Sequence, residues 1–444
     1  MAVERIRGTE MTQKKRKKKP IWKRYKLVWP AKNENTGSGQ TRRVVRRKLR
    51  LRKEAVYALL GIVALLCLIF IPRAVQSSNL KKLGYKKPEI QAIREQKLAK
   101  TVLDNQYYSP YLASSIVNKT LRTDYIKFYA GMRGDRTLSN DEFLLIQRLR
   151  EKGYEDTQII NLLVNLKNWE ITPLLVFDYQ YNEQFYIDDC KSQTGNSPTN
   201  FELTGSYFTP YLDTHPVDDP SSIEKLVNKT YYLSEDFVPE QLTGLSNLYA
   251  AEGRELAGIA ADPFKAMCEG GRSAGVTFYT TSAYRDYASQ ETVYNSYVTA
   301  RGEDYANTYS AKAGFSEHQT GLAVDVAATN EDDKSEFKDT NAFRWLSMNC
   351  MNYGWIMRFP EGKALITGYD YEPWHYRYVG IDVAKAVYEK NLTYDEFYML
   401  YLKPWEEGYK PADDILKATD FRTAAEAEPE ATETPKAEES PKAN

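Results

Sequence analysis

Two short stretches of this 444-residue chain combine residue types that can bind a metal ion and activate water. Residues 316–325 have the sequence SEHQTGLAVD, and residues 371–379 have the sequence YEPWHYRYV. The chain has only three histidines, and two of them, His318 and His375, lie in these stretches. A catalytic zinc ion takes three protein ligands, keeps one position open for water and needs a base beside that water. Two imidazoles, one carboxylate ligand and one further carboxylate therefore predict a zinc site.

The first stretch is expected to be a turn followed by a β-strand. Gly321 marks the turn, and residues 322–326 then alternate, so that the larger apolar side chains face a core and Asp325 faces the other way. The small side chain of Ala323 leaves room beside that carboxylate. The turn can therefore bring His318 back over the open face of the strand.

The second stretch is expected to be a bend that leads into another strand. Pro373 argues against a helix here, because proline lacks the N–H and clashes with the preceding turn. The motif is thus different from the two-histidine helix of thermolysin-like enzymes. Residues 375–379 should form a strand with His375 and Arg377 on one face, where Arg377 either orients a ligand or pairs with a structural acid. Glu372 precedes the bend, within reach of a metal-bound water.

Ordinary core packing is the alternative for each stretch taken alone. A single buried histidine is more often a hydrogen-bonded core residue than a ligand, and a strand rich in tyrosine and tryptophan is more often simple core. Two complementary stretches in a chain with so few histidines favour the metal site.

The motifs Ser-x-His-x-x-Gly-x-Ala-x-Asp and Glu-x-x-His resemble those of the VanY-type zinc D-Ala-D-Ala carboxypeptidases. These belong to the lysostaphin/D-Ala-D-Ala/hedgehog metallopeptidase group. Further segments agree with the resemblance, which covers residues 220–400. They are Ser282-Ala283-Tyr284-Arg285 with Gln290, Asn228-Lys229 with Leu233, Phe237 and Pro239, and Trp355, Arg358-Phe359-Pro360 and Thr367-Gly368-Tyr369.

The resemblance implies a fold and a role for each site residue. The fold is α+β, an antiparallel sheet with flanking helices of the D-Ala-D-Ala peptidase/hedgehog-like kind. Glu372 is expected to take a proton from water, and Arg285 to stabilise the carbonyl oxygen as charge develops. The assigned residues are His318, Asp325 and His375 as ligands of Zn²⁺, Glu372 and Arg285 as catalytic residues, and Gln290 and Ser316 as substrate-binding or supporting residues.

The implied substrate is the peptide stem of peptidoglycan, cleaved at its terminal D-amino-acid bond by a D,D-carboxypeptidase. Relatives that are L,D-carboxypeptidases or peptidoglycan endopeptidases leave those two activities as alternatives. A non-catalytic, zinc-containing module that binds the cell wall is an alternative of another class. That alternative predicts loss of the base or of the arginine, and both Glu372 and Arg285 are present.

The chain before these motifs indicates a membrane anchor. Residues 1–53 hold 20 Lys or Arg against three Glu, and residues 55–72 contain no charged residue. A helix of that length nearly spans the roughly 30 Å hydrocarbon core of a bilayer. A cleaved secretory signal is the competing interpretation, but residues 73–76 (RAVQ) are a poor cleavage site. We therefore expect residues 1–54 to be a basic cytoplasmic tail that binds no nucleic acid, residues 55–72 a single-pass anchor, and everything beyond to be extracellular.

The remaining chain divides into three predicted parts. Residues 74–205 are expected to be a helical stem with a weak internal repeat, in which Gly84-Tyr85 and Gly153-Tyr154 each end a helix. Residues 206–409 are the predicted catalytic domain, with helices over 240–274, 286–301, 341–353 and 382–390 and a strand over 276–282. The tail 410–444 is poor in large apolar residues and is expected to be disordered.

The remaining histidine and the cysteines are not expected to form a second site. His215 is predicted to be a surface residue, because no carboxylate or second histidine accompanies it at a metal-binding spacing. Cys268 and Cys350 are expected either to pair or to be buried free thiols. No cysteine lies in a Cys-x-x-Cys motif, and no histidine is left over to activate a cysteine nucleophile.

Overall fold

The computed structural model describes residues 53–177, 183–192, 197, 201–205, 207, 209–328 and 336–422. The predicted basic tail up to residue 52 and the last part of the predicted disordered tail, residues 423–444, lie outside the described residues. The chain divides into two compact units, Met1–Ile71 and Pro72–Asn444.

The described part of the first unit is helical. Helix α1 (Lys53–Leu83) begins in this unit, and its apolar side chains from Val56 to Ile71 are exposed. Among the described residues, α1 is the one helix long and apolar enough to cross a membrane, a criterion that a signal sequence near the N-terminus also meets. The predicted span over 55–72 is therefore helical, and its use as an anchor is a proposal.

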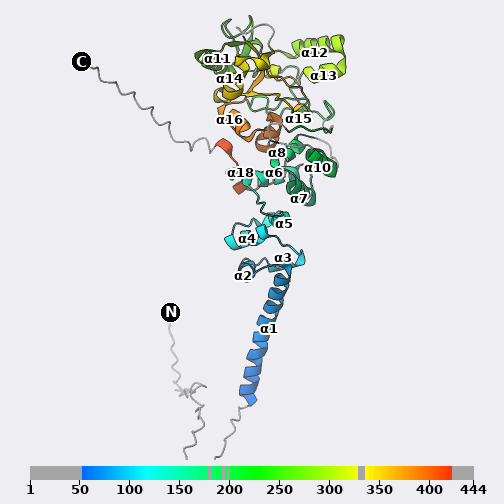
Figure 1. Cartoon of the computed structure of the whole chain (residues 1–444), viewed down its shortest axis with the longest axis vertical. Coiled ribbons are helices and arrows are strands. Elements are labelled where there is room, and N and C mark those ends of the chain that lie inside the picture. Colours follow the sequence, from blue (N-terminus) through cyan, green and yellow to red (C-terminus); the bar gives the residue numbers. More distant parts are fainter. Residues whose placement is uncertain are drawn as a thin grey trace, which may run out of the picture. The chain divides into compact units, whose positions relative to one another are not determined.

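The second unit opens with short helices, as predicted for the stem (Figure 1). Gly84 and Gly153 both have positive φ, and Tyr85 and Tyr154 donate backbone hydrogen bonds back to Leu80 and Leu149. These are the two repeated helix ends that the sequence predicts. The helices are α2 (Lys87–Glu95), α3 (Ala99–Asp104), α4 (Pro110–Asn118), η2 (Thr123–Tyr125), α5 (Ile126–Gly131), α6 (Asn140–Glu151), α7 (Asp156–Asn165), α8 (Asn168–Ile171), α9 (Pro173–Val176) and α10 (Glu183–Ser192).

The predicted catalytic part, residues 206–409, contains a four-stranded antiparallel sheet with the order β5-β6-β8-β7. This arrangement of sheet and helices confirms the predicted α+β class. Its strands are β5 (Phe278–Ser282), β6 (Ala323–Ala328), β7 (Trp355–Met357) and β8 (His375–Tyr378). Its helices are α11 (Gly258–Ser273), α12 (Tyr287–Arg301), α13 (Glu303–Tyr309), η3 (Glu317–Thr320), η4 (Phe337–Asp339), α14 (Asn341–Asn349), η5 (Cys350–Tyr353), α15 (Ala364–Thr367) and α16 (Ile381–Lys390).

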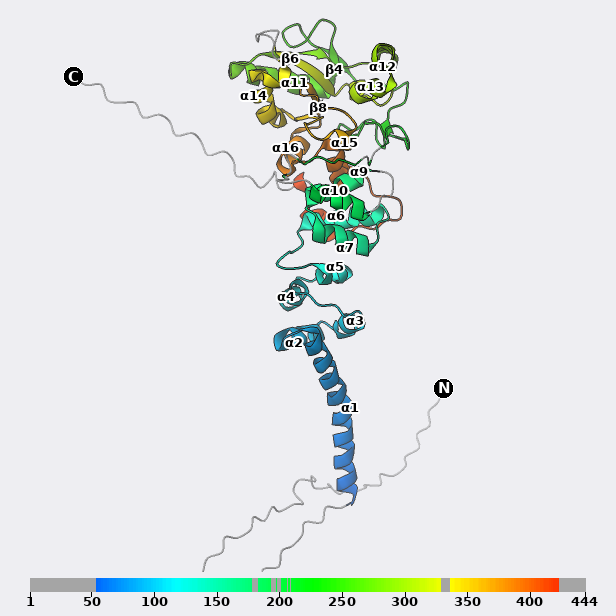
Figure 2. The same ribbon diagram turned by 45° about the vertical axis from the view of Figure 1, so that its right-hand side comes forward.

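The alternation predicted for β6 decides which face of the sheet is core. Val324 and Val326 are buried in one apolar cluster with Phe264 of α11 and Leu346 of α14. Asp325, which lies between the two valines, therefore faces the opposite side. Figure 2 shows α11 and α14 beside the sheet, with α12 and α13 at the other side of the domain.

The stem is joined to the catalytic part by a shared core. Phe143 and Leu144 of α6 belong to the same buried apolar cluster as Val387 of α16 and as Phe397 of α17 (Tyr394–Phe397). Buried Thr172 also donates a 2.7 Å hydrogen bond to Glu396. The expected boundary at 205/206 thus separates two segments that fold against each other.

Arg148 is a buried charged link between α6 and the end of the catalytic part. Its guanidinium lies 3.5 Å from the ring centre of Trp405 and donates to the carbonyl oxygens of Leu400 (3.1 Å) and Lys403 (2.6 Å). It also pairs with Glu151 at 2.9 Å. Segment η6 (Tyr398–Leu402) and the residues after it are thus fixed on the stem.

Replacing Arg148 with Ala is expected to lower the free energy of unfolding by about 3–5 kcal/mol, because Glu151 and two carbonyl groups lose a buried partner. Arg150→Ala is the control, because Arg150 lies on the same helix and pairs with Asp156 within the stem. Arg150→Ala should lower the free energy of unfolding by about 1 kcal/mol. Urea unfolding of both variants measures how much unfolding free energy each substitution removes. Equal losses would contradict the conclusion that Arg148 links α6 to the end of the catalytic part.

Three segments differ from their predicted structure. Residues 242–257 contain a hairpin of β3 (Leu242–Gly244) and β4 (Glu255–Ala257), where helix was predicted. Residues 183–192 form α10, although the stretch 182–222, which is rich in Asn, Asp, Ser, Thr and Pro, predicts a linker or long loop. Helix α18 (Asp413–Ala418) lies in the predicted disordered tail, because its Ile415 is fully buried in the core shared with the stem. A small parallel pair, β1 (His215–Pro216) and β2 (Tyr231–Tyr232), completes the structure.

Candidate metal centre

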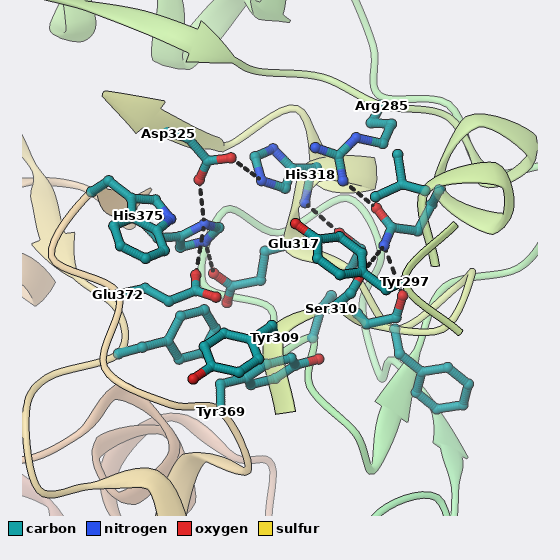
Figure 3. Close-up of a pocket in the computed structure, with 18 of the residues that line it drawn as sticks. Arg285, Tyr297, Tyr309, Ser310, Glu317, His318, Asp325, Tyr369, Glu372 and His375 are labelled. Carbon is teal, nitrogen blue, oxygen red and sulfur yellow. Dashed lines mark hydrogen bonds and ion pairs between the residues drawn. The ribbon is translucent and has the colours of Figure 1, made fainter. Parts of the chain in front are cut away.

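The three predicted ligands meet in the structure (Figure 3). Asp325 of β6 and His375 of β8 are direct cross-strand partners in the antiparallel ladder. His318 lies on η3, just before the turn into β6. One donor atom from each residue lies within 4.8 Å of the other two, and the two imidazole rings are perpendicular with centroids 5.1 Å apart.

Gly321 makes the turn that returns His318 to the strand. Its φ is +66°, a left-handed conformation that favours glycine. A Cβ at this position would also lie 3.0 Å from the backbone nitrogen of Ala257. The turn predicted at Gly321 is present, and it needs glycine for both reasons.

Each imidazole has one ring nitrogen fixed by the protein and one directed to the shared point. His318 Nδ1 lies 2.7 Å from the carbonyl oxygen of Ala283, so it donates, and Nε2 lies 3.2 Å from Asp325 Oδ2. His375 has the reverse arrangement, with Nδ1 2.9 Å from Asp325 Oδ1 and Nε2 3.4 Å from Glu317 Oε2. Anchoring the far nitrogen is how proteins orient histidine ligands, so this donor set fits a metal ion.

The charges around the site favour a bound cation. Burial by itself raises the pKa of Asp325, but His318 and His375 hold that pKa well below its usual range. Burial by itself lowers the pKa of His375, but the carboxylates of Asp325 and Glu317 raise it to about 10. Burial lowers the pKa of His318. Buried carboxylates that stabilise positive charge at one point are what a divalent ion requires.

Glu372 lies beside this point, at the bend predicted before β8. Its backbone N–H donates to the carbonyl oxygen of Phe359, and its own carbonyl oxygen accepts from the N–H of His375. The carboxylate Oε2 lies 3.8 Å from His375 Nδ1. Burial raises the pKa of Glu372 to about 8, so the structure holds a carboxyl group able to exchange a proton near neutral pH.

Arg285 follows β5 and lines the same cavity. Its side chain donates to Gln290 Oε1 at 2.6 Å and to Ser282 Oγ at 2.8 Å. Gln290 is itself fixed by donating to the carbonyl oxygen of Ala311 at 2.7 Å. Ser316 caps the N-terminus of η3, because its hydroxyl accepts from the N–H of His318 at 3.3 Å. Gln290 and Ser316 thus both support neighbouring site residues.

The cavity that these residues line has a volume of about 370 Å³. Its walls also include three tyrosines to which the sequence assigns no role in the site, Tyr297 of α12, Tyr309 of α13 and Tyr369 (Figure 3). No spacing in the sequence distinguishes Tyr297 and Tyr309 from the other tyrosines of the chain, whereas Tyr369 lies in the Thr367-Gly368-Tyr369 segment of the resemblance. Tyr297 and Tyr309 line the cavity of the predicted ligands because α12 and α13 fold beside it.

Glu317 is a further buried residue beside the ligands to which the sequence assigns no role. Glu317 lies inside the first motif and is buried between Arg358 and Arg377, at 2.8 Å and 3.0 Å. Burial by itself raises the pKa of Glu317, but the two arginines hold it well below its usual range. For Arg377, the structure therefore selects pairing with a structural acid over contact with a ligand.

The residues predicted to lie outside the site do so. His215 is exposed, and its Nε2 lies 3.6 Å from Asp213, away from the metal ligands. Cys268 and Cys350 are buried free thiols, one of the two arrangements expected for them. Burial raises the pKa of both thiols to about 12. Neither thiol lines the cavity described above.

Comparisons with known proteins agree with the motifs. A family model described as VanY, D-alanyl-D-alanine carboxypeptidase, matches residues 253–381. The putative carboxypeptidase YodJ of Bacillus subtilis (strain 168) is 36% identical over 227 residues, which cover 49% of this chain and 82% of YodJ.

Solved structures of related enzymes also match. The LdcB LD-carboxypeptidase is 34% identical, with a TM-score of 0.39 over 42% of this chain and 89% of that chain. A mutant of the vancomycin resistance D,D-pentapeptidase VanY, solved in complex with Zn(II), is 31% identical, with a TM-score of 0.35 over 40% of this chain and 99% of that chain.

Proposed function

Because this chain belongs to the VanY family of D-alanyl-D-alanine carboxypeptidases, we propose that it is a zinc-dependent carboxypeptidase of peptidoglycan stem peptides. The family is one of peptidases, and the metal, the residue roles and the substrate are what we propose for this chain. One observation carries it: His318, Asp325 and His375 meet at one point, with the carboxylate of Glu372 beside it.

Zinc is the metal that suits these donors. Two imidazole nitrogens and one carboxylate oxygen form a three-ligand set typical of catalytic zinc sites. His318 would bind through Nε2 and His375 through Nδ1, because their other nitrogens are engaged elsewhere. When bound, Zn²⁺ acts as a Lewis acid and makes water acidic enough to give up a proton near neutral pH.

Glu372 is the residue that moves the proton. Its carboxylate accepts a proton from the attacking water and then gives it to the nitrogen of the leaving amino acid. The carboxylate lies next to His375 Nδ1, the nitrogen that would bind the metal, so Glu372 is on the metal side of that imidazole ring. Glu372 is also buried, which raises the affinity of its carboxylate for a proton.

Arg285 is suited to stabilise the substrate's carbonyl oxygen as it becomes negative. Its guanidinium is held in place by Gln290 and Ser282 before any substrate arrives. A charge fixed in advance stabilises a transition state without the cost of reorganisation. Gln290 and Ser316 are therefore proposed as supporting residues, and the sequence analysis left that choice open.

The identity of the cleaved bond can be tested directly. Incubating the purified chain with matched stem tetrapeptides and pentapeptides should release a single D-alanine from the pentapeptide, as measured by mass spectrometry. A D,D-carboxypeptidase stops at the tetrapeptide. Release of D-alanine from the tetrapeptide alone would instead identify an L,D-carboxypeptidase.

Two further outcomes would contradict the proposal. If cross-linked peptides are incubated in the same way, internal cleavage without release of a terminal residue would indicate an endopeptidase. Peptide binding without any cleavage, by protein that contains zinc, would indicate a non-catalytic wall-binding module. The matched control is the same incubation with chelated, metal-free protein.

A membrane-anchored location suits such a substrate. We propose that α1 anchors the chain, with the basic residues before it in the cytoplasm and the catalytic part outside the cell. Washing membranes with alkaline carbonate should leave an anchored chain in the pellet. Release of a shortened chain into the medium would identify residues 55–72 as a cleaved signal.

A further inference from the structure

Glu317 is buried beside the proposed metal site. It neither binds the metal in that site nor faces solvent. It lies directly before the ligand His318 in sequence, yet its side chain contacts the other histidine ligand, His375. The side chain of Glu317 is only 3% exposed. An ionised group buried to this extent requires strong partners.

The two oxygens of the Glu317 carboxylate have different partners. Oε1 accepts from Arg358 Nε at 2.8 Å and from Arg377 Nη1 at 3.0 Å. Oε2 lies 3.4 Å from His375 Nε2, which is a long hydrogen bond. The arginines therefore hold one oxygen and leave the other to face the imidazole.

The two arginines are fixed in turn by groups far along the chain. Arg358 makes a two-pronged pair with Asp395 of α17, at 2.6 Å and 3.1 Å, and Asp395 also accepts from Asn228. Arg377 donates to the carbonyl oxygens of Ile223 and Lys225. Both arginines are fully buried. This network gives the carboxylate of Glu317 a fixed orientation.

We propose that Glu317 is a positioning residue that accepts the Nε2–H of His375 and thereby keeps the lone pair of His375 Nδ1 directed at the metal. The inference rests on the proposed zinc site and adds to it a residue that orients a ligand from behind. A neutral imidazole carries one N–H, so an acceptor at Nε2 decides that Nδ1 is free to bind.

An amide cannot take the place of this carboxylate. In Glu317→Gln the amide oxygen remains the only acceptor for the two arginines, so its NH₂ group would face His375 Nε2. Two donors would then oppose each other. The imidazole would be driven to carry its proton on Nδ1, the nitrogen that the metal needs.

The test measures zinc affinity of the full chain by competition with a chelator. Glu317→Gln is expected to weaken zinc binding about 10- to 100-fold, the usual effect of removing a partner of a histidine ligand. It should also shift the visible spectrum of the cobalt-substituted protein. Asp395→Asn is the matched control, because Asp395 binds the same Arg358 and has no contact with His375. It should lower stability and leave zinc affinity within about 3-fold of the wild type, a small fraction of the effect at Glu317.

Equal losses of zinc affinity in the two variants would overturn the proposal, because both would then act through the arginine network alone. Wild-type affinity in Glu317→Gln would overturn it as well. If that variant does not fold, Glu317→Asp provides the second test. This change keeps the charge beside the arginines but withdraws it from His375, so affinity must still fall. Absence of zinc binding by the wild type would instead overturn the proposed function.

Discussion

Replacing Glu372 with Gln is expected to lower kcat by about 10²- to 10⁴-fold while the protein still binds zinc. The glutamine has nearly the same shape but cannot accept the proton of the attacking water. The carboxylate lies 3.8 Å from His375 Nδ1 and is not one of the three ligands that meet, so metal binding should survive. D-alanine release and zinc content of the same preparation are the measurements.

Glu361→Gln is the control for this change, because Glu361 is an exposed glutamate only eleven positions earlier. It should have wild-type activity and zinc content. Normal turnover by Glu372→Gln would show that another group takes the proton. Loss of zinc along with activity would show that Glu372 holds the metal, and the division into three ligands and a base would be wrong.

Replacing His318 with Ala is expected to remove both bound zinc and activity. His318 provides one of only three protein ligands in the proposed site. Removing a residue that merely supports a ligand weakens metal binding by up to about 100-fold, so the loss of a ligand should weaken zinc binding by more than that. Zinc content after dialysis, measured by mass spectrometry, and D-alanine release should fall together. Treating the wild type with a chelator should have the same effect, and added zinc should restore it.

The third histidine provides the control. His215 is exposed and lies outside the cavity, so His215→Ala should keep both zinc and activity. If His318→Ala retained its zinc through dialysis, the ion would lie elsewhere. If the chelated wild type still released D-alanine at the normal rate, the reaction would not depend on a metal.

The meeting of His318, Asp325 and His375 could be predicted because the features that bring them together are local in the sequence. Gly321 and the alternation after it bring His318 over the strand face that carries Asp325, and Pro373 excludes a helix at the second motif. The structure shows the turn, the strand and the bend. Pairing Asp325 with His375 across β6 and β8 required only that the two strands be neighbours.

The role of Glu317 could not be predicted, because it depends on residues brought together from distant segments. Its partners Arg358 and Arg377 lie 41 and 60 positions away, and Arg358 is fixed by Asp395 on another helix. Nothing in the spacing of the first motif separates Glu317 from an exposed glutamate. Only its burial in the folded chain gives it a function.

Fold predictions failed where tertiary packing overrode local pattern. The leucines before residue 257 have a spacing that also suits a helix, yet Leu242–Gly244 pairs with Glu255–Ala257 as a hairpin. The composition of residues 410–444 suggested disorder throughout. Ile415 nevertheless finds a buried position against the stem, so residues 413–418 are helical.

In the proposed site, His318, Asp325 and His375 hold one zinc ion at the point where η3, β6 and β8 meet. Anomalous diffraction from crystals of the zinc-loaded protein, collected across the zinc absorption edge, would locate that ion. We expect one strong peak about 2.0–2.2 Å from His318 Nε2, His375 Nδ1 and an oxygen of Asp325. Active protein with no peak there, or with its peak at other residues, would contradict the proposed site.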